Sequence, residues 1–144
     1  MQEYIQKIED LIAAKEDLPF QYGQNDCTIF ACEVIEAITG HNPALPYIGR
    51  YTTFLGGTRH LKADGYEDHV HFIKSFCHDD QIPKAFIEIG DLGLIIEDDA
   101  LIWALVCGSF IIALTPKGLI RLSLDRLIEV YRVRPNDGEI QQST

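Results

Sequence analysis

A cysteine near the start of an apolar helix is the residue of this chain best placed for covalent chemistry. Cys27 follows the loop residues 22–26, and apolar side chains then recur at helical spacing as far as Thr39 and Gly40. The first N–H groups of a helix have no partner within it and the helix dipole is positive there, so a thiolate in the first turn is stabilised. Cys27 is the candidate nucleophile, and its position predicts a thiol slightly more acidic than a free cysteine.

Asp26, directly before the cysteine, is the second candidate catalytic residue. As an N-cap it would favour the helix dipole, and as a neighbouring negative charge it would raise the pKa of the Cys27 thiol. A purely structural alternative stays open for the pair, because most free cysteines behave as small buried hydrophobic side chains.

A cysteine nucleophile needs a base, and the sequence does not assign one. A paired histidine would both activate the thiol and protonate the leaving group. The chain has five histidines, all before the region expected to form strands: His41, His60, His69, His71 and His78. Any of them could fold back onto Cys27. His71 and His78 would share a helix face, but the paired spacing of zinc ligands is lacking, so we predict no metal and no cofactor.

The remaining segments predict helices in the first half of the chain and strands in the second. Helices are expected from Tyr4 to before Pro19, over 27–39, within 51–63 and over 67–77. Strands are expected at 92–96, 101–107, 110–114, 119–122 and 129–133, with a tight turn at Gly108-Ser109. Helices followed by an antiparallel sheet make one α+β domain over residues 1–135, with a polar, frayed tail over 136–144.

Composition limits the classes of partner. The chain has 144 residues, 47% of them hydrophobic, which suits one domain with a sizeable core. A net charge of -10 argues against binding to nucleic acid or to an anionic membrane surface. No secretory leader pattern opens the chain and the four cysteines form no Cys-x-x-Cys pair, so we expect a cytoplasmic protein with reduced thiols. The oligomeric state is not indicated.

Short motifs resemble the NlpC-type branch of the papain-like cysteine peptidases. Asp26-Cys27-Thr28 is similar to the Asp-Cys-Ser-Gly motif that holds the nucleophile at a helix start in that family. Gly90-Asp91-Leu92 is similar to the Gly-Asp-Leu that opens its first strand. More closely, the chain from about Phe20 to Arg134 resembles a small family of phage and prophage proteins related to those peptidases. The residues that carry this likeness are 22–27, Ala31, 37–40, 49–51, Gly90-Asp91, 106–108 and Gly118-Leu119. The resemblance implies a papain-like fold and a place in the bacterial host cell or on the virion.

One feature of those peptidases is absent. The strand that carries their catalytic histidine corresponds here to Ile102–Gly108, and no histidine stands near its start. This favours a non-enzymatic or degenerate member that acts in assembly or binds a host protein. The alternative is a thiol-dependent amidase or peptidase with Cys27 as nucleophile. The expected partner is a protein or a peptide-like substrate, and the candidate residues that line its cleft are Tyr22, Asn25, Arg50, Tyr51 and Trp103.

Overall fold

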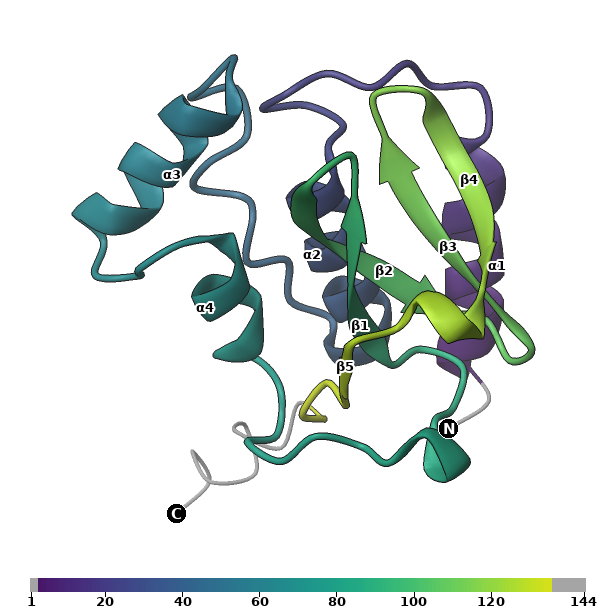
Figure 1. Ribbon diagram of the computed structural model, residues 1–144. Coiled ribbons are helices and arrows are strands. Elements are labelled where there is room, and N and C mark those ends of the chain that lie inside the picture. The colour runs from purple at the N-terminus through teal and green to yellow at the C-terminus, as the bar shows by residue number, and fades with distance from the viewer. Residues whose placement is uncertain (1–2, 136–144) are drawn as a thin grey trace.

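The computed structural model describes residues 3–135, in which helices come first and strands second, as Figure 1 shows. The α-helices are α1 (Glu3–Lys15), α2 (Cys27–Thr39), α3 (Phe54–Ala63) and α4 (His69–Lys74). The strands are β1 (Leu92–Glu97), β2 (Ala100–Val106), β3 (Phe110–Thr115), β4 (Gly118–Ser123) and β5 (Glu129–Tyr131), with short 3-10 turns at Lys84–Phe86 and Leu124–Arg126. The α+β class is confirmed, and the tail predicted for residues 136–144 lies outside the described residues.

The strands form one antiparallel sheet in the order β4-β3-β2-β1-β5. β1 opens directly after Gly90-Asp91, as predicted, and pairs with β2 along its whole length. β3 pairs with β2 only at Leu105 and Val106, so the predicted β2–β3 hairpin is confirmed at that end alone. In the described part of the chain, residues 100–104 of β2 therefore have a strand neighbour on one side only.

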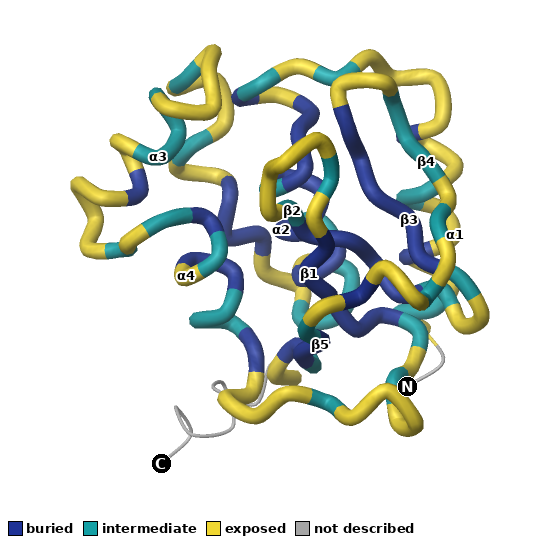
Figure 2. The backbone as a smooth tube through the Cα atoms, in the orientation of Figure 1, coloured by how far each residue is buried: buried dark blue, intermediate teal, exposed yellow. Residues whose placement is uncertain are grey.

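Helix α2 lies at the centre of the molecule, where Figure 2 shows most of the buried backbone. The Asp26 side chain caps its first turn by accepting from the Ile29 N–H, and Gly40 ends it with φ of 84°, a conformation that favours glycine. The face of α2 with Phe30 and Val34 packs on one side of the sheet. A second apolar cluster covers the other side: Ile95, Ala104, Val106, Ile111, Ala113, Leu127 and Val130.

Helices α3 and α4 stand beside α2 on the side away from α1 and β4, as Figure 1 shows. The Thr53 side chain caps α3, and the Gly56-Gly57 pair does not interrupt it. Helix α4 is shorter than the sequence predicted. The Asp68 side chain caps it by accepting from the His71 N–H, and the chain leaves the helix after Lys74 because Cys77 forms a bridge to the segment after β5.

Candidate functional site

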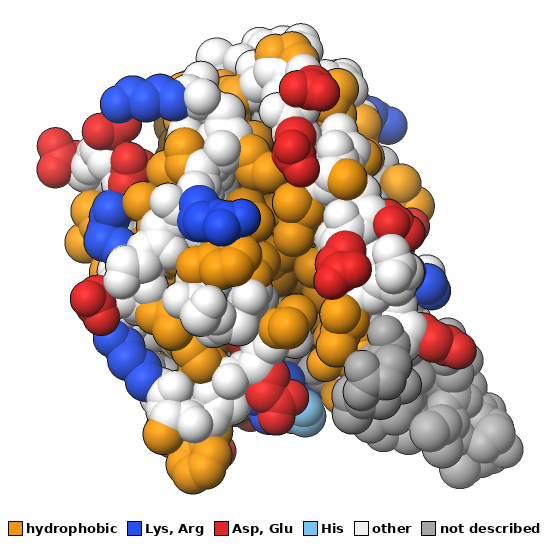
Figure 3. Space-filling view, turned by 90° about the vertical axis from the view of Figure 1, so that its right-hand side faces the viewer, with side chains coloured by type: hydrophobic (Ala, Val, Ile, Leu, Met, Phe, Trp, Pro, Cys, Tyr) orange, Lys and Arg blue, Asp and Glu red, His pale blue; other side chains and the backbone are white. Residues whose placement is uncertain are grey.

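Three hollows in the described part of the molecule differ in what lines them. One, of about 440 Å³, lies between α1 and α2. Another, of about 300 Å³, lies between α1 and β4, on the face that Figure 3 shows with apolar side chains gathered between scattered charged ones. Among residues 3–135, neither of these two hollows is lined by a cysteine or a histidine. A third, smaller hollow lies where α3 and α4 meet the start of α2, and it contains the candidate nucleophile.

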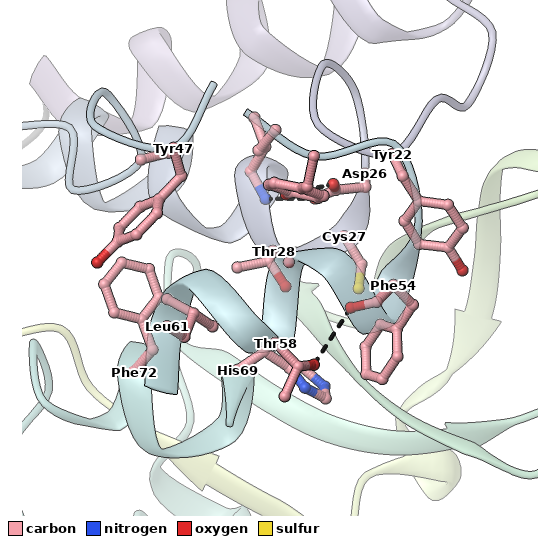
Figure 4. Close-up of a pocket in the computed structure, with 14 residues that line it drawn as sticks. Tyr22, Asp26, Cys27, Thr28, Tyr47, Phe54, Thr58, Leu61, His69 and Phe72 are labelled. Atoms are coloured by element: carbon pink, nitrogen blue, oxygen red, sulfur yellow. Dashed lines mark hydrogen bonds between the residues drawn. The ribbon is translucent and has the colours of Figure 1, made fainter. Parts of the chain in front are cut away.

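The smaller hollow brings Cys27 and His69 to one cavity, shown in Figure 4. Its free volume is about 30 Å³, which by this measure holds about two water molecules. Cys27 is 8% exposed and His69 is 7% exposed, so both face the interior rather than solvent. Of the five histidines that the sequence left open, His69 alone is among the residues lining this cavity.

Burial controls the state of the Cys27 thiol. It raises the pKa to about 12, and the Asp26 carboxylate adds to the rise. Hydrogen bonds to the sulfur from the Thr28 hydroxyl and from the Trp103 backbone lower the pKa by less. The prediction of a slightly acidic thiol is therefore wrong, because it weighed the helix terminus and not the burial. At neutral pH Cys27 carries its proton.

Asp26 organises the loop that leads into α2. Its Oδ1 accepts the Ile29 N–H at 2.9 Å, and its Oδ2 accepts the Gly23 N–H at 2.9 Å and the Tyr51 hydroxyl at 2.6 Å. The side chain is 2% exposed, so these bonds compensate its burial. The N-cap role and the effect on the Cys27 pKa are both confirmed. With both oxygens engaged, Asp26 is a positioning residue here.

Residues of β2 hydrogen-bond both the ring and the backbone carbonyl of His69. Its ring Nε2 lies 2.6 Å from the Leu101 carbonyl oxygen, and its own carbonyl oxygen accepts from the Trp103 indole Nε1 at 3.2 Å. A carbonyl oxygen can only accept, so Nε2 carries the proton and Nδ1 is the basic nitrogen. His69 Nδ1 is buried and has no hydrogen-bond partner within residues 3–135.

The unpaired edge of β2 explains how this strand hydrogen-bonds both His69 and Cys27. Leu101 and Trp103 are two apart, so their backbone groups point to the same edge of the strand. β3 pairs with β2 only further along, which leaves this edge free in the described chain. The Leu101 carbonyl oxygen then accepts from His69, and the Trp103 backbone hydrogen-bonds the Cys27 sulfur.

The other sequence-predicted residues divide between the cavity and its supports. Tyr22 and Tyr51 line the cavity, as expected. Trp103 is not a lining residue: it is fully buried, and its indole N–H donates to the His69 carbonyl oxygen instead. Arg50 is exposed and is not a lining residue.

Asn25 is not a lining residue either, but it fixes the loop before Cys27. Its Oδ1 accepts from the buried Lys15 ammonium at 2.8 Å, and its Nδ2 donates to the Pro19 carbonyl oxygen at 2.9 Å. Lys15 also pairs with Glu33 of α2 at 2.7 Å. These contacts join the end of α1 to the loop and to α2.

The sequence did not single out His69 from the other histidines, although a local signal exists. Asp26 caps α2 and Asp68 caps α4, and in each case the next residue, Cys27 or His69, is the first of its helix. Thr28, the third residue of the Asp26-Cys27-Thr28 motif, also lines the cavity. The remaining wall residues are Ile29, Ala44, Tyr47, Phe54, Gly57, Thr58, Leu61 and Phe72.

His71 and His78, the pair considered for metal, are both exposed, and His71 Nδ1 accepts the Glu67 N–H at 2.9 Å. Within residues 3–135 no three His, Cys, Asp or Glu side chains gather as a metal site would require. None of the helices in that range is long and apolar enough to cross a membrane.

The fold and the site define an α+β protein in which a cysteine and a histidine, each first in its helix, share one mostly apolar cavity. Residues 1–133 match the family described as Domain of unknown function (DUF6950), and the chain belongs to that family. A search of the curated proteins found no match.

Proposed function

We propose that this protein is a thiol hydrolase that cleaves an acyl bond, such as an amide, with Cys27 as nucleophile and His69 as general base. One observation carries the proposal: the buried, unpartnered Nδ1 of His69 lines the same cavity as the Cys27 thiol. Leaving a buried polar atom without a partner costs about 1–3 kcal/mol, so a merely structural histidine is poorly placed here. A base that takes a proton during the reaction is well placed.

The proposed reaction begins from a neutral pair. As the Cys27 sulfur attacks the acyl carbon, its proton passes to Nδ1 of His69, which then protonates the leaving group. Because the thiol pKa is about 12, attack and proton transfer must be concerted rather than start from a stored thiolate. The Leu101 carbonyl oxygen, which accepts from Nε2, stabilises the imidazolium that forms.

The start of α2 supplies a backbone N–H for the negative oxygen that develops. The N–H groups of Ile29 and Phe30 go to the side chain and carbonyl of Asp26. Of the two earlier ones, the Cys27 N–H hydrogen-bonds its own sulfur. The Thr28 N–H is the backbone donor that we assign to the oxyanion.

We further propose a papain-like arrangement, as the resemblance to the NlpC-type peptidases implies. In those peptidases a strand carries the histidine, whereas here α4 brings His69 to the start of β2 and the strand contributes backbone groups only. The lack of a strand histidine is therefore compatible with activity. The link to phage and prophage proteins, acting in the bacterial host cell, belongs to the same proposal.

A second candidate is a non-enzymatic member of the same fold that binds a protein. The observation that favours it is the protonated, buried thiol in a cavity of only about 30 Å³. The two candidates differ in what they require of His69, because a binding protein has no need of its basic nitrogen.

Acylation by p-nitrophenyl acetate separates them. We expect the wild type to release nitrophenol with an acetyl group on Cys27, seen by mass spectrometry, and Cys27→Ser to lose this label. His69→Gln should lower the rate by about 10²–10⁴-fold, the usual contribution of a general base. The control is His71→Gln, two residues further along α4 and exposed, which should leave the rate unchanged. Equal rates in the two histidine variants would overturn the proposal.

A further inference from the structure

We propose that the cavity beside Cys27 binds a short, uncharged acyl group, so that the substrates are esters, thioesters or amides of small apolar acids. This inference rests on the proposed function and adds its substrate class. Three features carry it: the chemistry of the walls, the lack of a free charge, and the size of the space.

The walls of the cavity are mainly hydrocarbon and aromatic. Ile29 of α2, Leu61 of α3 and Phe72 of α4 come from three different helices and close on the same space. All three are at most 6% exposed, so they are fixed parts of the core rather than mobile surface groups. Such walls stabilise an apolar group and offer nothing to a carboxylate or an ammonium.

Among residues 3–135, no charged side chain in the cavity is free to pair with a charged substrate. Asp26 is the one carboxylate that lines the cavity in this range, and its oxygens already accept from Ile29, Gly23 and Tyr51. No lysine or arginine of the same range lines it. A charged acyl group would therefore lose its hydration without an ionic partner, which is costly.

Phe54 limits the length of the acyl group. Its ring meets the His69 ring edge-to-face at 5.2 Å between centroids, and the Tyr22 ring at 6.4 Å. Figure 4 shows the Phe54 ring beside the Cys27 sulfur and the His69 imidazole. Because Phe54 is 47% exposed, it forms the outer wall, and a long chain could enter only by displacing it. The free volume of about 30 Å³ suits an acyl chain of a few carbons.

The acyl group enters this space when it is transferred to Cys27. A bond forms between the Cys27 sulfur and the acyl carbon, and the bond from that carbon to the leaving oxygen, sulfur or nitrogen breaks. His69 passes the thiol proton to the leaving group. Water then attacks the thioester, the acid departs, and the thiol recovers a proton. No oxidant or reductant is needed.

A set of p-nitrophenyl esters tests the inference: acetate, butyrate, octanoate and the monosuccinate, whose acyl chain ends in a carboxylate. We expect kcat/KM for acetate and butyrate to exceed that for octanoate and succinate by at least roughly tenfold. Thr58→Lys, which places a cation in the wall, should raise the succinate-to-butyrate ratio, whereas His60→Lys on the exposed side of α3 should not. Phe54→Ala should raise the octanoate-to-butyrate ratio, and its neighbour Leu55→Ala, exposed and outside the cavity, should not.

The outcomes separate the inference from the function on which it rests. Labelling of Cys27 by every ester at similar rates, or equal effects of Phe54→Ala and Leu55→Ala, would overturn the inference and leave the hydrolase intact. Absence of Cys27 labelling by all four esters would overturn the proposed function and the inference with it.

Discussion

The Nε2 atom of His69 lies 2.6 Å from the carbonyl oxygen of Leu101, the second residue of β2. This hydrogen bond fixes a histidine from a short helix at the start of the β1–β2 hairpin. It forms because β3 pairs with β2 only at Leu105 and Val106, which leaves the Leu101 carbonyl oxygen free to accept. Ring orientation and tautomer both follow from this one contact.

Trp103 anchors the backbone of the proposed base, so its loss should affect rate more than binding. Trp103→Phe removes the indole N–H that donates to the His69 carbonyl oxygen at 3.2 Å. We expect kcat for p-nitrophenyl acetate to fall severalfold with little change in KM, and the free energy of unfolding to fall by about 1 kcal/mol. An unchanged kcat in a folded Trp103→Phe protein would show that this anchor does not position His69.

Asp26 should have opposite effects on fold stability and on thiol reactivity. Asp26→Asn points an amide donor at the Gly23 N–H and replaces a charged acceptor by a neutral one. We therefore expect the free energy of unfolding, measured in urea, to fall by roughly 1.5–3 kcal/mol. Removing the charge should also lower the Cys27 pKa, so alkylation at pH 9 should be faster than in the wild type.

The matched control is Asp68→Asn, the cap of α4, whose side chain accepts the His71 N–H at 2.8 Å. Asparagine caps a helix about as well as aspartate, so stability should change by a few tenths of a kcal/mol, and Cys27 alkylation should not change. Slower alkylation of Asp26→Asn would contradict the electrostatic role given to Asp26.

The buried thiols should make the fold sensitive to alkali. Burial raises the pKa to about 12 for Cys27 and Cys77 and to about 11 for Cys107, from the ordinary 9.0. Above pH 9 the unfolded chain releases these protons while the folded chain keeps them. The free energy of unfolding should therefore fall between pH 9 and pH 11, by at most about 1.4 kcal/mol per pH unit for each thiol.

Urea unfolding in reductant at pH 7, 9 and 10 measures this loss. Cys107→Ala removes the most accessible of the three thiols. It should make the fall of the unfolding free energy with pH less steep by the contribution of one thiol. Stability that is constant up to pH 10, or the same slope in the variant, would show that burial does not hold these thiols protonated.

Asp91 should matter for folding rather than for chemistry. Its two oxygens accept from Nε and Nη2 of Arg132, each at 2.9 Å, and tie the start of β1 to the segment after β5. Asp91→Asn should lower the free energy of unfolding by roughly 1.5–3 kcal/mol, the range for hydrogen bonds to charged groups. Glu88→Gln, whose carboxylate is 62% exposed and 3.9 Å from Arg132, should change stability by less than about 0.5 kcal/mol. Equal effects of the two substitutions would contradict this assignment.

Local signals were sufficient to predict most elements. The Asp26 cap and Gly40 define both ends of α2, and the apolar runs give each strand to within two residues. The end of α4 could not be predicted, because Cys77 leaves the helical pattern to form a bridge with Val133, which lies far along the chain.

Of the two proposed catalytic residues, the sequence could indicate Cys27 but not His69, because a tertiary contact with β2 positions His69. Cys27 was marked by its place after Asp26, but the base depends on how far β3 pairs with β2. The apolar pattern of β2 runs unbroken through this point and gives no sign that the strands diverge. The pKa of the thiol could not be predicted for the same reason, since residues of α3 and α4, far along the chain, line the cavity around Cys27.

The central claim is that Nδ1 of His69 receives the proton of the Cys27 thiol, and the rate of Cys27 alkylation by iodoacetamide against pH tests it most directly. In His69→Gln we expect a slow reaction that rises about tenfold per pH unit up to about pH 11, as an unassisted thiol of pKa about 12 requires. The wild type and His71→Gln should react at least roughly 10²-fold faster at pH 7 through base assistance. Coincident pH curves for the wild type and a folded His69→Gln protein would contradict the claim.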